Sequence, residues 1–253
     1  MLENKKIRSL LLIAALFAGI DSVSGAEIRD LADYKQDPRL YVDAAAGDLP
    51  LLPSEEQKRL NAEYDLLFFA PWHMSAPRHT LEQVSRGFRE YGNKPGYQRD
   101  GTPYPPEWMG KMAVNARLED YPQGGFPAVT VKRIDFRILP TRDSHSFYPQ
   151  PRGRDHAFDN LQESSAPPGT PVLVTLVSRD GRWLLAETSS ALGWVPATDL
   201  AAVDETFIRQ WENGRYVAVV RDKAEVRDEK RGRSFAAPLG AVRRGGELNG
   251  VHG

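Results

Sequence analysis

The sequence predicts an α+β protein in which a small helical region packs on a small β-barrel, with an incomplete second barrel after it. Three observations predict this class. Apolar residues recur at helical spacing three times between residues 54 and 118. From residue 127 they alternate with polar residues between Pro, Gly and Asp-Gly turn signals. A second, shorter set of such runs begins after residue 204.

The first helix is predicted to begin at a capping box, in which Ser54 caps the helix and Gln57 reaches back to it. Apolar residues then follow on one face, at Leu60, Tyr64, Leu67 and Phe68. We expect Pro71 to end this helix, because proline cannot continue the backbone hydrogen bonds.

A second helix is predicted from Thr80, where Gln83 completes a similar box, to a stop at Gly92. A third, shorter helix is predicted from Glu107 to about Leu118. These helices bury too little apolar surface to form a core of their own. We therefore expect them to clasp another part of the chain.

The barrel is predicted from alternating runs that start at Pro127. A long polar excursion from Thr141 to Pro168 separates the first strands from the next. The runs 172–178 and 183–188 flank Asp180-Gly181, and Asp-Gly between apolar runs is a strong hairpin signal. Gly193-Trp194-Val195-Pro196 supplies a further short strand.

A short helical linker is predicted from Asp204 to Trp211, and strands of a second barrel at 216–220, 224–226 and 236–242. After Val242 the pattern ends in RRGGELNGVHG. A barrel without its later strands exposes unpaired strand edges. We therefore expect a truncation or a shift of reading frame near Val242.

Composition excludes several classes of function. The net charge of −1 gives no electrostatic case for binding nucleic acid. The chain has no cysteine, which excludes disulfides, thiolate metal sites, a cysteine nucleophile and a lipid-modified cysteine at the N-terminus. We expect no cofactor and no metal.

The first 26 residues are predicted to be a signal peptide. Lys5, Lys6 and Arg8 precede an apolar run from Leu10 to Ile20, and small residues at 23–26 suit cleavage. The run is about half the ~20 residues that a membrane-spanning helix needs. We expect a mature protein of the periplasm or cell envelope without a membrane anchor.

Several short blocks resemble one family. FFAPW at 68–72 and EWM at 107–109 resemble the N-terminal stabilising (clip) region of NlpC/p60 cell-wall peptidases. RILPT at 137–141, FDNLQESS at 158–165, GTPV at 169–172, DGRW at 180–183 and GWVP at 193–196 resemble a bacterial SH3 (SH3b) domain. After the signal peptide over 1–26, the resemblance implies a helical clip over 27–126, an SH3-like barrel over 127–203, and a linker with a truncated second SH3-like barrel over 204–253.

In that family a papain-like domain follows and cleaves peptidoglycan stem peptides after D-glutamate with a cysteine nucleophile. This chain has no cysteine to carry that role, so we expect no peptide hydrolysis by the chain alone. The leading hypothesis is the non-catalytic front portion of a secreted stem-peptide endopeptidase, with an NlpC/p60 catalytic domain as a possible partner. A stand-alone SH3b protein that binds peptidoglycan is the alternative, and a decayed gene product is a third.

The resemblance also implies that the first SH3b domain shapes the peptide site. The candidate substrate-binding residues are Asp159, Gln162, Ser164, Tyr148 and Trp194. Two interpretations stay open for Asp159, which either binds a ligand amine or caps backbone amides within its loop. Trp194 either stacks on a ligand or packs the barrel, and Trp183 is expected in the core. No catalytic residue is assigned. Asp143, His145, Asp155 and His156 match no standard metal-ligand spacing.

Overall fold

The computed structural model describes residues 33–35, 37–41, 49–94, 96–149, 158–214, 216–221, 223–228, 232–237 and 239–244. The chain divides into two units, residues 1–57 and 58–253. In the first unit the described residues include one short 3₁₀ turn, η1 (Pro38–Leu40). The predicted signal peptide lies outside the described residues.

Four α-helices lie wholly within the described residues: α3 (Ser54–His73), α4 (Leu81–Gly92), α5 (Trp108–Ala116) and α6 (Glu205–Trp211). The expectation that Pro71 ends the first helix was wrong, since α3 continues to His73. Proline at this place lies in the last turn, where it removes one backbone donor and little of the helix remains to be disrupted. Ser54 is the first helical residue of α3, so the predicted cap position lies one residue too late.

The predicted capping box of α4 is confirmed. The hydroxyl of Thr80 accepts from the backbone N–H of Gln83 at 3.3 Å, and the Gln83 side chain accepts from the Thr80 N–H at 2.8 Å. The third predicted helix is present but interrupted. Arg117 takes a left-handed conformation (φ 52°) that ends α5 before a 3₁₀ turn, η3 (Leu118–Asp120).

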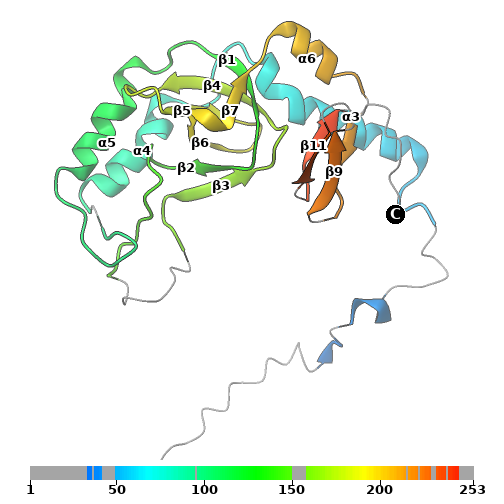
Figure 1. Ribbon diagram of the computed structural model, residues 1–253, viewed down its shortest axis with the longest axis horizontal. Helices are drawn as coiled ribbons and strands as arrows, with labels where there is room; N and C mark the ends of the chain where they lie inside the picture. The colour runs from blue at the N-terminus through cyan, green and yellow to red at the C-terminus, as the bar shows by residue number, and fades with distance from the viewer. Residues whose placement is uncertain are drawn as a thin grey trace, which may run out of the picture. The chain divides into compact units, whose positions relative to one another are not determined.

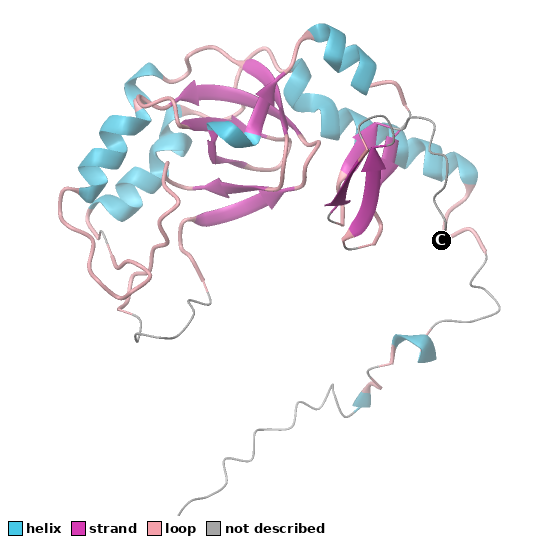
Figure 2. Ribbon diagram, viewed as in Figure 1, coloured by secondary structure: helices cyan, strands magenta, loops and turns pink. Residues whose placement is uncertain are grey.

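Seven antiparallel strands form one sheet in the order β3-β2-β6-β5-β4-β1-β7 (Figures 1 and 2). Their bounds are β1 (Phe126–Thr130), β2 (Ile134–Arg137), β3 (Gln162–Ala166), β4 (Pro171–Val177), β5 (Trp183–Glu187), β6 (Leu192–Pro196) and β7 (Leu200–Ala202), with a 3₁₀ turn η4 (Ala197–Asp199) before β7. The α+β class is therefore confirmed.

Two details of the sheet refine the predictions. The Asp180-Gly181 turn joins β4 to β5, and Gly181 has a φ of +68°, which glycine adopts without strain. The excursion expected to be a loop up to Pro168 contains strand β3, which pairs with β2. Its sequence QESSA has one buried residue, so apolar alternation gave no signal for it.

The helices share a core with the barrel, as expected. Val84, Phe88 and Tyr91 of α4 and Trp108 of α5 belong to the same buried cluster as Leu139, Leu161, Leu176, Trp183, Leu185 and Trp194. A second cluster fills the barrel itself and includes Ile134, Phe136, Val172, Val174 and Val195. The helices complete one side of the barrel core (Figure 1).

Residues after 204 form α6, capped by the side chain of Asp204, and two strand pairs. β8 (Tyr216–Ala218) pairs with β11 (Val242–Arg244), and β9 (Ala224–Asp228) pairs with β10 (Arg233–Ala237). The single strand predicted over 236–242 was wrong. Gly240, at φ +81°, turns the chain between β10 and β11. Helix α6 packs with α3 in a third cluster of buried residues around Phe69 and Trp72.

Candidate functional site

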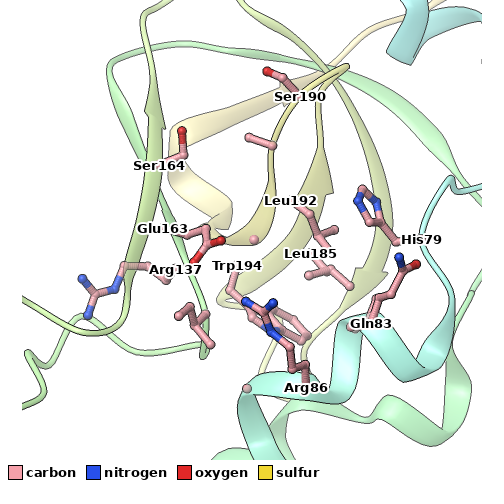
Figure 3. A pocket seen from close by; sticks show the side chains of 15 residues that line it. His79, Gln83, Arg86, Arg137, Glu163, Ser164, Leu185, Ser190, Leu192 and Trp194 are labelled. Atoms are coloured by element: carbon pink, nitrogen blue, oxygen red, sulfur yellow. The ribbon is translucent and has the colours of Figure 1, made fainter. Parts of the chain in front are cut away.

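A cavity of about 440 Å³ lies between helix α4 and the barrel (Figure 3). Its size suits a small ligand. We call it the α4–β6 pocket. It is lined by His79, Gln83 and Arg86 on the helix side, by Glu163 and Ser164 of β3, and by Leu192 and Trp194 of β6, among other residues.

Three polar side chains lie along one edge of the pocket. Gln83 and Arg86 are three residues apart in α4, so they lie on one face of the helix. His79 precedes the cap residue Thr80 and is placed by its contact with Glu187. Val84 and Phe88 turn into the core and fix the rotation of the helix. The polar edge therefore faces the pocket, as Figure 3 shows.

The ring of His79 is held by a buried carboxylate. Its Nδ1 lies 2.7 Å from Oε2 of Glu187, which is 0% exposed at the end of β5. Glu187 also accepts from the backbone N–H of Arg78 at 3.3 Å. A buried carboxylate needs such partners because it loses its hydration. The contact at Nδ1 leaves Nε2 as the ring nitrogen available to a ligand.

Tyr121 holds the backbone at His79 in place. Its hydroxyl donates to the carbonyl oxygen of His79 at 2.6 Å. Burial, and then the charge of Glu187, raises the pKa of Tyr121 to about 12. The phenol therefore remains a hydrogen-bond donor at neutral pH.

The floor of the pocket depends on two glycines. A Cβ on Gly193 would lie 2.8 Å from Cβ of Phe136 and 2.9 Å from the backbone nitrogen of Arg137. A Cβ on Gly87 would collide with Cγ2 of Ile138. Only glycine allows β6 to approach β2, and α4 to approach the end of β2, this closely.

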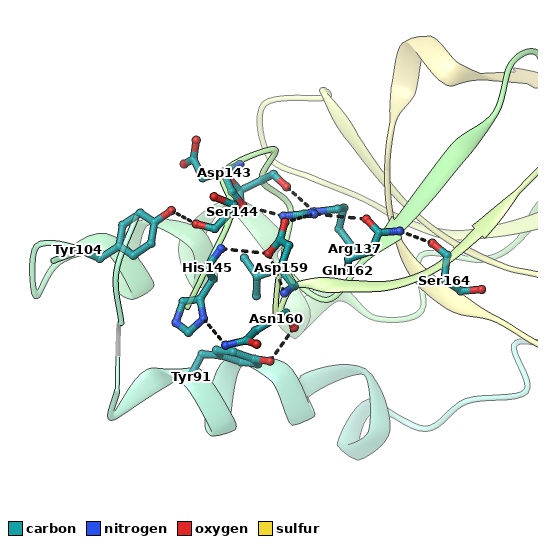
Figure 4. A network of polar contacts seen from close by, with 12 residues as sticks. Tyr91, Tyr104, Arg137, Asp143, Ser144, His145, Asp159, Asn160, Gln162 and Ser164 are labelled. Atoms are coloured by element: carbon teal, nitrogen blue, oxygen red, sulfur yellow. Dashed lines mark hydrogen bonds and ion pairs between the residues drawn. The ribbon is translucent and has the colours of Figure 1, made fainter. Parts of the chain in front are cut away.

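A second polar network lies beside the pocket and is centred on Arg137 of β2 (Figure 4). Its guanidinium donates to the carbonyl oxygens of Thr141 at 3.1 Å and Asp143 at 2.6 Å, and to Oδ2 of Asp159 at 2.6 Å. A weaker contact reaches Oε1 of Gln162 at 3.4 Å. The network ties both ends of the long loop after β2 to the strand.

The contacts of Asp159 favour the structural interpretation left open by the sequence. Its Oδ2 pairs with Arg137, and its Oδ1 accepts from the backbone N–H groups of His145 and Leu161, each at 3.0 Å. Both carboxylate oxygens are thus used within the loop. Gln162, which is exposed, donates from Nε2 to the carbonyl oxygen of Ser164 at 2.7 Å.

The other candidates divide into two groups. Ser164 and Trp194 line the α4–β6 pocket, although Trp194 is 1% exposed and also belongs to the core. Tyr148 is 75% exposed and does not line the pocket. Trp183 is buried in the core, as expected.

Sequence reasoning missed His79, Gln83, Arg86, Glu163 and Glu187 as parts of one site. Gln83 was recognised only as a capping residue. The spacing of Gln83 and Arg86 was a usable signal, because it marks a polar stripe beside the apolar face of α4. The pairing of His79 with Glu187 spans 108 residues and had no local signal.

No group of three or more potential metal ligands occurs among the described residues. Of the four Asp and His residues whose spacing matched no metal site, Asp143 accepts from Arg137 through its backbone carbonyl, and His145 is buried among aromatic rings. Asp155 and His156 lie outside the described residues. None of the helices in the described part of the chain has the length and apolar content to cross a bilayer.

Comparisons with known proteins identify three regions of the chain. Residues 9–121 match the N-terminal NLPC_P60 stabilising domain, residues 146–196 an SH3 domain of the SH3b1 type, and residues 204–242 an SH3 domain of the SH3b2 type. A search of curated proteins gave no match.

A solved structure described as a novel NlpC/P60 endopeptidase from Photobacterium damselae subsp. piscicida has a similar fold. The TM-score is 0.74 at 23% sequence identity, over 85% of this chain and 51% of that one. At this identity the likeness shows the fold alone, and this chain spans about half the length of that protein. The chain therefore contains an N-terminal stabilising domain of the NLPC_P60 type followed by two SH3b domains.

Proposed function

We propose that this chain is the non-catalytic front portion of a secreted peptidoglycan stem-peptide endopeptidase, of the NlpC/P60 γ-D-glutamyl type. Its first SH3b domain stabilises the peptidase and helps to shape the binding of stem peptides. The protein acts in the periplasm or cell envelope. The order of the three matched domains carries this proposal.

The shared core of α4, α5 and the first barrel supports a positioning role. Because Trp194 and Leu185 pack with Val84 and Phe88, the stabilising helices and the barrel hold one rigid arrangement. The α4–β6 pocket lies at this joint. A pocket built from two domains that share a core keeps its shape without an added partner.

Co-sedimentation with purified sacculi tests the binding role. We expect the mature chain to sediment with intact sacculi and to stay in solution when an amidase has removed the stem peptides. Equal sedimentation with both preparations would indicate binding to the glycan strands and would contradict a role with stem peptides. No sedimentation with either would contradict any binding to peptidoglycan.

A second candidate is a stand-alone envelope protein that binds peptidoglycan. The two SH3b domains support it, since a binding module of this kind needs no catalytic residue. The coding sequence downstream, translated in three frames, separates the two candidates. A domain with a catalytic cysteine and histidine supports the first, and its absence supports the second.

A further inference from the structure

The α4–β6 pocket contains charged groups that the fold itself does not use. Arg86 and Glu163 line it, and neither side chain makes an ion pair or hydrogen bond with another described residue. By contrast, Arg89 on the same helix donates to Ser85 and to the carbonyl oxygen of Glu82 at 3.0 Å. Hydrogen bonds within the helix therefore give Arg89 a structural role. No such contact explains why Arg86 and Glu163 lie at the pocket.

Two donors converge on one side of the pocket, beside the ring of His79. Nδ1 of that ring donates to Glu187, so its Nε2 accepts in the neutral imidazole and donates only in the imidazolium form. The first donor is Nε2 of Gln83, since the capping box uses only Oε1 of that side chain. Arg86 adds a guanidinium, and Figure 3 shows it reaching over Trp194 between Gln83 and Glu163. A row of donors ending in arginine suits a carboxylate, which accepts charge-assisted hydrogen bonds from several directions.

Glu163 and Ser164 restrict the ligand from the opposite wall. The Glu163 carboxylate lines this wall, where it would repel a second negative charge on a ligand and accept a hydrogen bond from a ligand N–H. The floor, made by Ile138, Leu192 and Trp194, is apolar. The matching chemical group has one carboxylate, an adjacent N–H and a small apolar side chain. The last residue of a peptide has all three.

We propose that the α4–β6 pocket binds the C-terminal carboxylate of a short peptide. The carboxylate accepts from Gln83 and Arg86 beside the ring of His79, and the last amide N–H donates to Glu163. The side chain of the last residue rests on the apolar floor. This inference rests on the proposed function only for the source of the natural peptide, either a stem peptide ending in D-alanine or a protein ending in an L-residue.

Binding of synthetic tripeptides tests the proposal, with calorimetry for affinity and the Trp194 indole N–H signal in NMR spectra for location. The peptides are Ala-Ala-Ala with a D- or an L-residue at the end, each as the free acid and as the C-terminal amide. We expect the acid to bind at least about tenfold more tightly than its amide, because charge-assisted bonds are lost. A preference for the D-peptide assigns stem peptides as the source, and a preference for the L-peptide assigns protein C-termini.

Arg86→Gln is the test variant, and Arg89→Gln on the same helix is its matched control. We expect about a tenfold loss of affinity for the acid with Arg86→Gln and none with Arg89→Gln. His79→Ala is less suitable because it leaves Glu187 buried without its partner. Equal binding of acid and amide, or equal losses in the two arginine variants, would overturn the proposal.

The two proposals fail in different ways. If the peptides bind but sacculi do not, the carboxylate site stands and the role with peptidoglycan fails. If sacculi bind while the acid and amide bind equally, the role with peptidoglycan stands and the carboxylate site is rejected.

Discussion

The indole N–H of Trp72 donates a 2.7 Å hydrogen bond to the backbone carbonyl of Ala128. The donor lies in helix α3 and the acceptor in strand β1, 56 residues further along the chain. The Trp72 ring also meets the rings of Phe207 and Trp211 edge-on, at centroid distances of 6.0 and 6.5 Å. One side chain thus connects the stabilising region, the first barrel and helix α6.

Replacing Trp72 tests this connection. We expect Trp72→Ala to lower the free energy of unfolding by about 3–5 kcal/mol, the range for losing a large buried aromatic side chain. Trp72→Phe keeps part of the packing, and its loss of the hydrogen bond contributes about 1–2 kcal/mol. Urea unfolding followed by circular dichroism measures both. Leu66→Ala, at a 75% exposed position of the same helix, should change stability little; a loss as large as that of Trp72→Ala would contradict the assignment.

Much of the fold could be predicted from local patterns. The capping box at Thr80 and the Asp180-Gly181 turn each lie within a few residues of the groups that they organise, so the sequence alone identified them. The second SH3b domain was also identified from short alternating runs. Strand β3 was missed because its stability comes from pairing with β2 rather than from apolar alternation.

The candidate site was less predictable, because its pieces are distant in sequence. Ser164 and Trp194 were named beforehand and do line the pocket. Asp159 was named for its charge, but the charge is matched by Arg137, 22 residues away. A single sequence does not distinguish a charged residue that forms an ion pair within the fold, such as Asp159, from one proposed to bind a ligand, such as Arg86.

The Arg137–Asp159 pair is expected to stabilise the long loop rather than to bind a ligand. Their side chains are 10% and 23% exposed, and breaking such a pair leaves a mostly buried charge without its partner. We expect Asp159→Asn to lower the free energy of unfolding by about 1–3 kcal/mol. Sedimentation with sacculi, measured well below the melting temperature, should not change. A variant with unchanged stability and lost sedimentation would instead make Asp159 a ligand contact.

Gly193 is expected to be intolerant of any side chain. A Cβ there would lie 2.9 Å from the backbone nitrogen of Arg137, and a backbone atom cannot move aside without disturbing the sheet. We expect Gly193→Ala to destabilise the chain by about 1–3 kcal/mol or more. Gly110→Ala is the control, since nothing lies within 4 Å of its Cβ position in α5. Alanine there should stabilise by about 0.5–1 kcal/mol, so the two melting temperatures should move in opposite directions.

Tyr91 should make the fold sensitive to alkaline pH. Its hydroxyl donates to the carbonyl oxygen of Asn160 at 2.8 Å, and burial, followed by the charges of Glu90 and Glu163, raises its pKa to about 12. A tyrosine in the unfolded chain titrates near pH 10. Between these values the unfolded state has released the proton and the folded state still holds it, so stability falls as pH rises. Below about pH 10 the contribution is fully present.

Urea unfolding at pH 8, 10 and 11 measures this effect. We expect the free energy of unfolding to fall between pH 10 and 11, and Tyr91→Phe to reduce that fall while costing about 1 kcal/mol at pH 8 through the lost hydrogen bond. Part of the fall should remain, because burial also raises the pKa of Tyr121 to about 12. Tyr148→Phe, at an exposed position of the loop, is the control. If Tyr91→Phe and Tyr148→Phe lose stability equally between pH 10 and 11, the buried hydroxyl of Tyr91 is not the cause.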